Sequence, residues 1–495
     1  MANDDTKATW AYHDGTKHSP ESVRRSRHVL DWDNMPLSFK VYVDLEPAPI
    51  PRDFTVSSLP ALAAISTPAR GGAAALDRTL LARLLHFSAG VVRRRAVPGG
   101  EMYYRAAACT GALYHIDLYL VTGALPDLEA GVYHFSPHDF SLRCLRRGDH
   151  RGVLVRASGG DAAIESAPVI AVCTSTFWRN AWKYQARTYR HCFWDDGTIL
   201  ANLLAVASAG DVRADVVLGF DDAEVNRLLD LDPLREVALS LVALGQADAS
   251  PAPAPAFAPL GFKTLPLSPV EVDYPAIRAM HEASSLPSGD AAAAWHRSSS
   301  PKPRAPAIGT ASTESVEAVI LRRGSTRHFA GRSIGADQLD AILRAATAPL
   351  PSDFTGDGAL TQIYAIANTV DGLEAGTYVY EAGALKPLRR GDFRREAGFL
   401  DLGQDLARDA AVNLYWLADL GPILAGFGNR GYRAAQLDGA IGGGRTYLAS
   451  YAQRLGATGL TFFDDAVIDF FSPHAAGKSV MFLMAVGRGG SLRMA

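Results

Sequence analysis

A seven-residue segment occurs twice in this chain, and this duplication constrains the fold more than any other feature. Residues 145–151 read LRRGDHR and residues 388–394 read LRRGDFR, 243 positions later. Three shorter matches keep the same order at nearly the same offset: 111–113 with 358–360, 131–133 with 376–378, and 220–222 with 463–465. A period this long excludes solenoids, whose repeats span about 20 to 50 residues. The sequence therefore predicts two homologous domains.

Segments of a different composition precede and separate the two copies. At 495 residues the chain is long enough for two domains that each bury a core. Residues 246–312 are rich in Pro, Ala and Ser, which favours an extended linker, and 269–286 could hold one short helix within it. Residues 1–75 have no counterpart ahead of the second copy, and their prolines indicate an extended arm on the surface. We therefore predict an arm (1–75), copy one (76–245), a linker (246–312) and copy two (313–495).

Strand-like and helix-like runs alternate within each copy. Short apolar runs at 114–121, 168–172 and 363–367 predict strands. Longer stretches at 198–208 and 439–455 predict helices, each followed by a glycine-containing turn. The expected fold class is α+β, with a central mixed sheet flanked by helices in each copy.

The charge balance and the N-terminus exclude several classes of protein. The chain has 49 basic and 52 acidic residues, so neither nucleic acid nor an anionic membrane is expected as a partner. The N-terminal residues lack a basic region followed by an apolar one, and no run of about 18 apolar residues occurs without a charge. We expect a cytoplasmic protein.

No metal site is expected. The four cysteines contain no C-x-x-C pair and no histidine lies at zinc spacing, which indicates reduced thiols. Asp221 and Asp222 are adjacent, but no third ligand lies at a suitable distance in the sequence. One of the two is expected to cap the helix that begins near residue 223.

The surroundings of Lys183 distinguish the two copies. Residues 183–190 read KYQARTYR, and the aligned residues 426–433 read GFGNRGYR, which keeps only the Arg-x-Tyr-Arg pattern. The titratable pair Lys183 and Tyr184 has become an apolar pair in copy two. Lysine is scarce, with eight against 41 arginines, so its presence here is informative. The residues alone leave open the alternative that this pair is ordinary surface.

Copy two opens with a cluster that could bind phosphate. Arg322, Arg323, Ser325 and Arg327 place three guanidinium groups and a hydroxyl within six residues. Such groups hold phosphate through charge-assisted hydrogen bonds. A solvated basic face remains the alternative. The arm segment 24–27, RRSR, is a weaker candidate for a second grip because its spacing differs.

These segments resemble motifs of the nitroreductase superfamily. The pattern at 322–329 is similar to its flavin-phosphate motif, and 105–114 resembles the segment that reaches the flavin from the opposing subunit. Residues 183–190 resemble the K-Y-x-x-R-x-Y-R signature of SagB-type dehydrogenases, which oxidise azolines to azoles on ribosomal peptides. The loops 219–222 and 461–465 resemble the one on which the flavin ring rests. The resemblance covers about 76–245 and 313–488.

The resemblance implies a composite flavin site. In the family the flavin lies between two subunits, so the duplication implies an intrachain pseudo-dimer of two nitroreductase-like domains with one FMN per chain. The phosphate would be bound by Arg322, Arg323, Ser325 and Arg327, and the rest of FMN by Cys109, Thr110, Gly111, Ala112, Leu113, Gly459, Leu460 and Thr461. Cys109 and His115 depart from the family's usual Ser and Pro, and a packing role for Cys109 is the alternative.

The resemblance also implies an activity. Lys183 would take a proton from an azoline-type ring of a peptide or small molecule while hydride passes to FMN, with O₂ as final oxidant. Burial and neighbours such as Arg187 would depress the pKa of the lysine, and Tyr184 would share the proton. An NAD(P)H-dependent nitro or quinone reductase and a flavin-binding scaffold without catalysis are the alternatives. A cyclodehydratase partner and further oligomerisation stay open.

Overall fold

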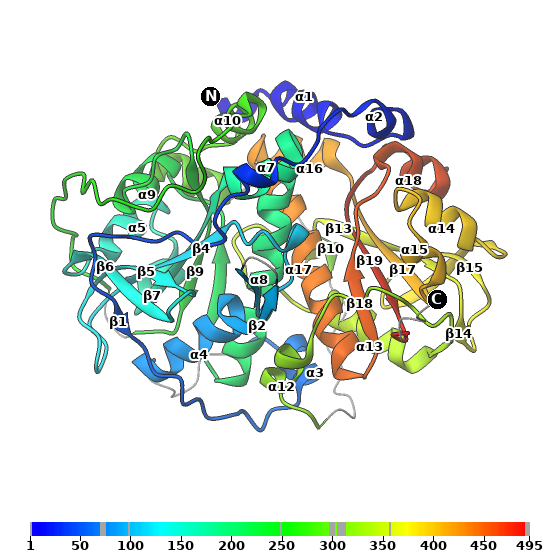
Figure 1. Ribbon diagram of the computed structural model, residues 1–495, viewed down its shortest axis with the longest axis horizontal. Coiled ribbons are helices and arrows are strands. Elements are labelled where there is room, and N and C mark those ends of the chain that lie inside the picture. The colour runs from blue at the N-terminus through cyan, green and yellow to red at the C-terminus, as the bar shows by residue number, and fades with distance from the viewer. Residues whose placement is uncertain are drawn as a thin grey trace.

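The computed structural model describes residues 2–69, 76–97, 100–247, 250–296, 302–303, 313–355 and 358–490. Within these ranges two halves, each a sheet with helices, stand side by side, with two long helices running between them (Figure 1). Helix α8 (Thr188–Ala209) belongs to copy one and α17 (Arg430–Ala452) to copy two. The predicted α+β class with two tandem units is confirmed.

Each half is built on a sheet with the same strand order. The first sheet runs β1-β6-β5-β4-β7-β9-β8 and the second runs β16-β15-β13-β17-β19-β18. Every neighbouring pair of strands in both sheets is antiparallel. The prediction of mixed sheets was therefore wrong. The extra strand β1 comes from the arm. The strands are β1 (Ala48–Pro49), β4 (Ile116–Thr122), β5 (Gly131–Ser136), β6 (Ser141–Arg147), β7 (Val169–Thr176), β8 (Ala214–Val217), β9 (Glu236–Leu244), β13 (Thr361–Ala367), β15 (Gly376–Glu381), β16 (Ala384–Arg390), β17 (Val412–Ala418), β18 (Gly456–Gly459) and β19 (Ser479–Gly487).

Shorter elements cover these sheets and connect the halves. A hairpin of β2 (Val91–Val97) and β3 (Gly100–Arg105) precedes β4, and two small sheets pair β10 (Lys302–Pro303) with β12 (Gly358–Ala359) and β11 (Ile334–Gly335) with β14 (Val370–Asp371). No helix in the described ranges combines the length and apolar character needed to cross a bilayer. The remaining helices include α3 (Ala61–Ser66), α4 (Arg78–Ala89), α5 (Arg151–Ala157), α6 (Ala162–Ser166), α7 (Phe177–Tyr184), α9 (Asp222–Leu228), α12 (Val316–Arg322), α13 (Ala336–Ala346), α14 (Arg394–Leu400), α15 (Asp405–Asp409), α16 (Leu420–Phe427) and α18 (Asp464–Phe471).

The predicted strands are confirmed within β4, β7 and β13, but both long helices begin earlier than predicted. Helix α8 begins at Thr188 rather than 198, and α17 at Arg430 rather than 439. Both are buried on nearly all sides, and their first turns carry buried charges such as Arg190 and Arg433. An apolar stripe at a period of 3.6 residues is therefore absent from these turns.

Small residues let α8 and α17 approach closely. A Cβ at Gly197 would lie 2.5 Å from the Cβ of Ala440, and one at Gly444 would lie 2.5 Å from the Cβ of Ala201. Buried residues of both copies join one continuous hydrophobic core. The pair of helices thus fixes the halves as a pseudo-dimer within one chain.

The arm is partly helical, which differs from the prediction of an extended segment. Helices α1 (Lys7–Gly15) and α2 (Pro20–Arg25) lie with α10 (Pro275–Ala283) along the upper edge of the molecule (Figure 1). The buried residues of α1 recur at helical spacing, and Ser19 and Ser22 form a capping box for α2. The helix anticipated in the linker is confirmed as α10, and α11 (Gly289–His296) follows it.

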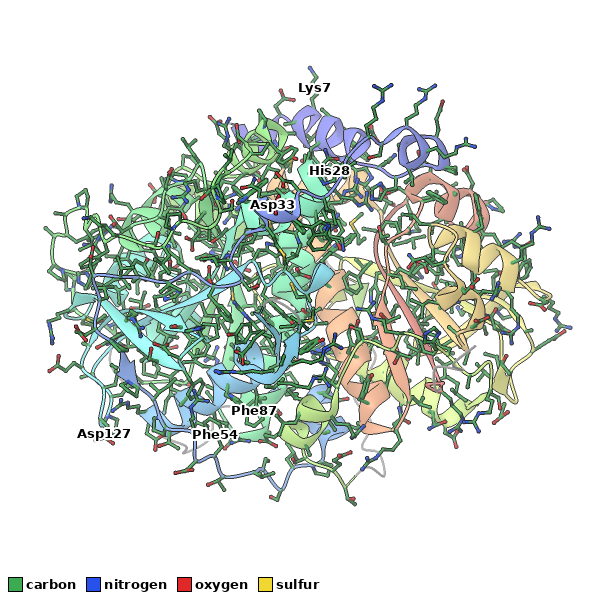
Figure 2. The ribbon with its side chains drawn as sticks, in the orientation of Figure 1. Lys7, His28, Asp33, Phe54, Phe87 and Asp127 are labelled. Atoms are coloured by element: carbon green, nitrogen blue, oxygen red, sulfur yellow. The ribbon has the colours of Figure 1, made fainter. Side chains whose placement is uncertain are left out.

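The middle of the arm is extended and lies on the first half. The Leu37 N–H donates to the Leu267 carbonyl at 2.8 Å, so arm and linker run side by side. Farther along, Phe54 packs against Phe87 of α4, with ring centroids 5.6 Å apart (Figure 2). The boundaries of arm, copies and linker stay predictions, and residues 70–75, 248–249, 297–301 and 304–312 lie outside the described ranges.

Candidate functional site

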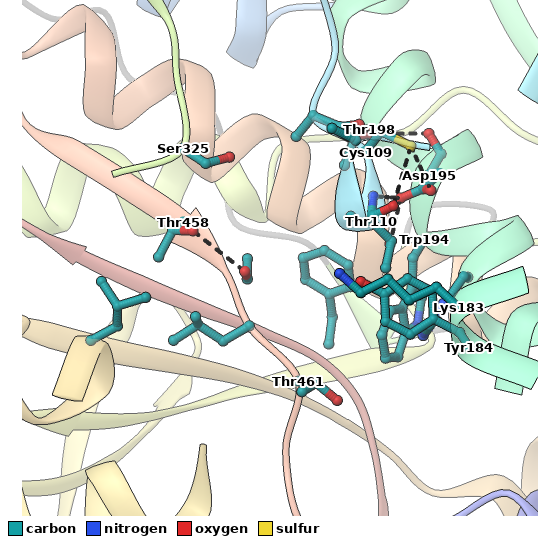
Figure 3. A pocket seen from close by; sticks show the side chains of 18 of the residues that line it. Cys109, Thr110, Lys183, Tyr184, Trp194, Asp195, Thr198, Ser325, Thr458 and Thr461 are labelled. Atoms are coloured by element: carbon teal, nitrogen blue, oxygen red, sulfur yellow. Dashed lines mark hydrogen bonds between the residues drawn. The ribbon is translucent and has the colours of Figure 1, made fainter. Parts of the chain in front are cut away.

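A cavity of about 480 Å³ lies between the two halves (Figure 3). Copy one contributes the loop before β4 and residues of α7 and α8, copy two contributes the loops after α12 and β18, and the arm contributes His18. Eleven of the fourteen predicted site residues line it: Cys109, Thr110, Gly111, Ala112, Lys183, Tyr184, Ser325, Arg327, Gly459, Leu460 and Thr461.

Three predicted residues do not line the cavity. Arg322 forms an ion pair with Glu314 and donates to the Tyr451 carbonyl at 2.8 Å. Arg323 donates through Nε and Nη2 to the Ala106 carbonyl, at 3.1 and 2.8 Å, and so ties the two copies together. Leu113 is buried in the core. Side chains at adjacent positions of a helix end diverge, which the motif alone does not reveal.

Ser325 and Arg327 are the two members of the basic cluster that face the cavity. The Ser325 hydroxyl lies 3.2 Å from the Tyr447 hydroxyl, which accepts the Gly459 N–H at 2.6 Å. The exposed guanidinium of Arg327 makes no ion pair or hydrogen bond with any residue in the described ranges. This end of the cavity thus offers a free cation and a hydroxyl to an anion.

Lys183 reaches into the cavity from the C-terminal end of α7 (Figure 3). Its Nζ lies 5.3 Å from the ring centroid of Tyr184. Burial lowers the pKa of Lys183, and the positive charge of Arg327 lowers it further. Arg187, which we expected to have this effect, instead pairs with Asp464 at 3.0 Å. The lysine is thereby brought closer to its neutral, proton-accepting form.

Tyr184 stays protonated and packs against the Gly111 loop. Burial raises the pKa of Tyr184, and the negative charge of Asp195 raises it further. Gly111 has a φ of +64°, and a Cβ there would lie 2.8 Å from the Tyr184 hydroxyl. Glycine is therefore required at this position for both conformation and space.

Asp195, which the sequence analysis missed, holds the cavity loop of copy one. Its carboxylate accepts the Thr110 N–H at 2.8 Å, the Thr110 hydroxyl at 2.7 Å and the Cys109 thiol at 3.0 Å. His115 Nε2 lies 2.8 Å from the same carboxylate. Burial raises the pKa of Cys109, and Asp195 raises it further, so the thiol stays protonated and packs. The equivalent Asp438, 243 positions later, was the available signal.

Aromatic and polar residues from α8 and copy two complete the lining. Trp194 donates through Nε1 to Gln436 at 2.6 Å and meets the Phe482 ring edge-on at 5.6 Å. Burial lowers the pKa of His191, whose ring packs on Tyr184. No motif indicated these residues, because they come from a helix interior and from separate strands. The remaining lining residues are His18, Ala108, Thr198, Leu402, Gln404, Leu406, Tyr447 and Thr458.

The signature arginines form a clamp that is present twice. Arg187 and Arg190 bind Asp464 at 3.0 and 2.6 Å across the interface. In the opposite direction, Arg430 and Arg433 bind Asp222 at 2.6 and 2.7 Å. All six side chains are buried. The clamps therefore hold the pseudo-dimer together. They also show that Asp222 corresponds to Asp464, whereas the sequence match had aligned Asp222 with Asp465.

On the other side of the pseudo-dimer, the position that corresponds to the cavity is covered by residues of the chain itself. Leu218 and Gly219 follow β8 as Leu460 and Thr461 follow β18, and their N–H groups donate to the Asp353 carboxylate. His296 Nδ1 lies 3.0 Å from the same carboxylate. The arm residues Arg24, Arg25 and Arg27, weighed as a second phosphate grip, are exposed and do not line the cavity.

Comparisons with known proteins agree with this architecture. Residues 320–488 match the model of the nitroreductase family. A crystal structure of a nitroreductase candidate from Anabaena variabilis is 27% identical, with a TM-score of 0.76 over 98% of this chain and 99% of that one. The microcin B17-processing protein McbC of Escherichia coli is 28% identical over 127 residues, which are 25% of this chain and 47% of McbC. The match thus spans about half the length of McbC.

Proposed function

We propose that this chain, whose residues 320–488 are a nitroreductase family domain, is an FMN-dependent dehydrogenase that oxidises azoline-type rings in a peptide or peptide-derived substrate. One observation carries the proposal. A single cavity combines the free cation of Arg327 in copy two with the Lys183 and Tyr184 pair of copy one. The first suits the phosphate of a flavin, and the second suits proton removal from a substrate.

The cavity lining fits FMN in size and chemistry. Its volume of about 480 Å³ is within the range of roughly 300–1,000 Å³ usual for ligand sites. Arg327 and Ser325 would bind the phosphate, with Arg323 holding the loop beside it. Trp194 and Phe482 provide an apolar wall for an aromatic ring. The predicted contacts from 109–112 and 459–461 line the space between.

The proposed reaction removes one proton and one hydride from adjacent carbons. Bound FMN supplies the hydride acceptor, and O₂ is the final oxidant. The neutral amine of Lys183 takes the proton from the α-carbon, aided by the lowered pKa that burial and Arg327 give it. Tyr184, which stays protonated, lies beside the amine and would donate a hydrogen bond to the bound substrate. The product ring is aromatic.

Purified protein titrated with FMN and incubated with an azoline-containing peptide tests this proposal. The expected product is lighter by two hydrogens in a mass spectrum, and FMN absorbance changes on binding. Lys183→Ala should abolish the oxidation and leave FMN affinity within about twofold. A protein that takes up no FMN, or one that binds FMN and leaves azoline peptides unchanged, would contradict the proposal.

A reductase is the second candidate, and the family match over 320–488 favours it. Such an enzyme would take hydride from NAD(P)H and reduce a nitro or quinone compound. The two candidates differ in the role of Lys183, because hydride transfer from a nicotinamide needs no base. NADPH consumption that persists in Lys183→Ala, without azoline oxidation in the wild type, would favour the reductase.

We propose one FMN per chain. The support is the asymmetry between the two sides, since Asp353 covers the Leu218 and Gly219 N–H groups and Gly426-Phe427 replace the Lys-Tyr pair. Phe427 packs on Trp295 with ring centroids 5.1 Å apart. On this second side, protein groups therefore occupy the contacts that a second flavin would need.

The name of McbC links this proposal to peptide processing. We extend it to a cytoplasmic role in peptide maturation, with a cyclodehydratase as the partner that makes the azoline. Affinity purification of tagged protein from cells containing the candidate cyclodehydratase tests this step. A cyclodehydratase that is not enriched relative to an unrelated tagged protein would contradict it.

A further inference from the structure

Among the described residues of the arm, His18 lines the cavity. Its backbone is fixed at both polar atoms, because the His18 N–H donates to Asp464 Oδ2 at 2.8 Å and its carbonyl accepts the Asp464 N–H at 3.0 Å. Asp464 is in turn held by Arg187 and Arg190. The buried clamp thus positions residue 18 on the cavity wall.

The other clamp holds a leucine at the same place. The Leu286 N–H donates to Asp222 Oδ2 at 3.0 Å, and the Leu286 carbonyl accepts the Asp222 N–H at 3.3 Å. Arg433 donates to the His281 carbonyl as Arg190 donates to the His13 carbonyl, at 2.8 and 2.6 Å. Position 286 is therefore the structural counterpart of position 18.

The two sides keep the clamp and differ in the side chains that it positions. Where the cavity is open, the residues are Lys183, Tyr184 and His18. On the side covered by Asp353, the counterparts are Gly426, Phe427 and Leu286. A purely structural role at position 18 is satisfied by leucine, as Leu286 demonstrates. The imidazole is retained only beside the Lys-Tyr pair, so it belongs with the chemistry of the cavity.

The imidazole is free to bind a ligand. Neither ring nitrogen of His18 makes a hydrogen bond within the described part of the chain. Burial lowers the pKa of His18 to about 4, with Arg187 and Arg190 adding to the effect and Asp464 opposing it. The other titratable groups lining the cavity are Cys109, Lys183, Tyr184, His191, Asp195, Arg327 and Tyr447. A neutral imidazole offers one donor and one acceptor, which matches the two polar groups of a peptide amide.

We propose that His18 is a substrate-binding residue whose imidazole hydrogen-bonds to a backbone amide of the peptide beside the ring that is oxidised. This inference rests on the proposed function. It makes the arm a part of the site rather than a covering of the surface, and it assigns the arginine signature a positioning role, because those arginines hold Asp464 and Asp464 holds residue 18.

The test compares His18→Leu, which installs the residue of the covered side, with His18→Gln, which keeps a donor and an acceptor. His138→Leu is the matched control, since His138 is an exposed histidine in the turn between β5 and β6 and lies outside the cavity lining. The readouts are kcat/KM for azoline peptide oxidation, FMN affinity, and the Kd of the azole product peptide measured by calorimetry on the holoprotein.

His18→Leu should lower kcat/KM and weaken product-peptide binding by about tenfold or more, with FMN affinity within twofold. His18→Gln should recover most of the loss, and His138→Leu should match the wild type. Wild-type kcat/KM and peptide affinity in His18→Leu, or an equal loss of FMN affinity, would overturn the inference. Wild-type protein that binds FMN but oxidises no azoline peptide would refute the proposed function and this inference together, a pattern distinct from failure of His18 alone.

Discussion

The carboxylate of Asp353 accepts the backbone N–H of Gly219 at 2.7 Å, and it accepts the neighbouring Leu218 N–H at 2.9 Å. A side chain of copy two thereby covers the edge of copy one that corresponds to the cavity loop at Leu460 and Thr461. The two composite positions of the pseudo-dimer therefore differ in structure. One keeps a cavity with titratable groups, and the other has become part of the core between the halves.

This asymmetry predicts one FMN per chain. Flavin released by denaturation, measured by absorbance against protein concentration, should approach a ratio of one after saturation with FMN. The Asp353 contacts should keep the second side closed at any FMN concentration that saturates the first. A ratio of two would show that the covered edge opens to admit flavin.

The basic cluster of copy two should divide into one phosphate-binding arginine and one structural arginine. Arg327→Ala should weaken FMN binding by about tenfold or more, because a charge-assisted hydrogen bond contributes roughly 1.5–3 kcal/mol. Arg322→Ala, the same substitution five residues earlier, should leave FMN affinity within about twofold, since Arg322 is engaged with Glu314 and Tyr451. Fluorescence titration of FMN measures both. Equal losses of FMN affinity in the two variants would show that Arg322 also binds the phosphate.

The pH dependence of turnover should report on Lys183. Because the neutral amine accepts the proton, kcat should rise with pH as Lys183 loses its proton, and burial and Arg327 place that pKa below the ordinary value. Arg327→Gln removes a positive charge, so the pKa of Lys183 should rise and the ascending limb should move to higher pH. The profile is measured at saturating FMN and peptide.

The matched control for this experiment is Arg322→Gln, which changes an equal charge outside the cavity lining. Its profile should coincide with that of the wild type. An ascending limb that stays in place in Arg327→Gln, or that moves to lower pH, would show that another group controls the rate.

The sequence predicted most of the architecture because the evidence for it is local. The duplicated segment and the apolar strands both follow from residue type and spacing. The counterpart of the arm was missed because residues 9–18 and 277–286 share only Ala11 with Ala279 and His13 with His281. Their equivalence rests on backbone contacts with the two clamps, and a carbonyl that accepts a hydrogen bond places no demand on its own side chain.

The candidate site was predictable where a motif named the residues and unpredictable where the fold assembled them. Lys183, Ser325 and Gly111 were found in this way. Asp195 and Trp194 lie within a helix that is buried on all sides, so no periodic pattern separates the face toward the cavity from the face toward the core. His18 lies in the arm, which was predicted to be extended on the surface, and the sequence of such a segment does not indicate what it will pack against.

The clamp at Asp222 gives a stability prediction with a defined pH range. Burial alone would raise the pKa of Asp222, but Arg430 and Arg433 outweigh it and lower the pKa to about 2. A carboxyl with a lowered folded-state pKa stabilises the fold at pH values above its ordinary pKa near 3.8, and that contribution is lost as the pH falls through about 2.

Asp222→Asn should therefore reduce the free energy of unfolding at pH 7 by about 3–5 kcal/mol, because two buried guanidinium groups lose their partner. The deficit should shrink below pH 4, because the unfolded wild type then binds a proton that the folded carboxyl does not take up until about pH 2. Asp221→Asn is the control next to it, since Asp221 caps α9 and asparagine caps equally well. Urea unfolding at pH 7 and pH 3 measures both variants, and a deficit in Asp222→Asn that is unchanged between the two pH values would contradict the assignment.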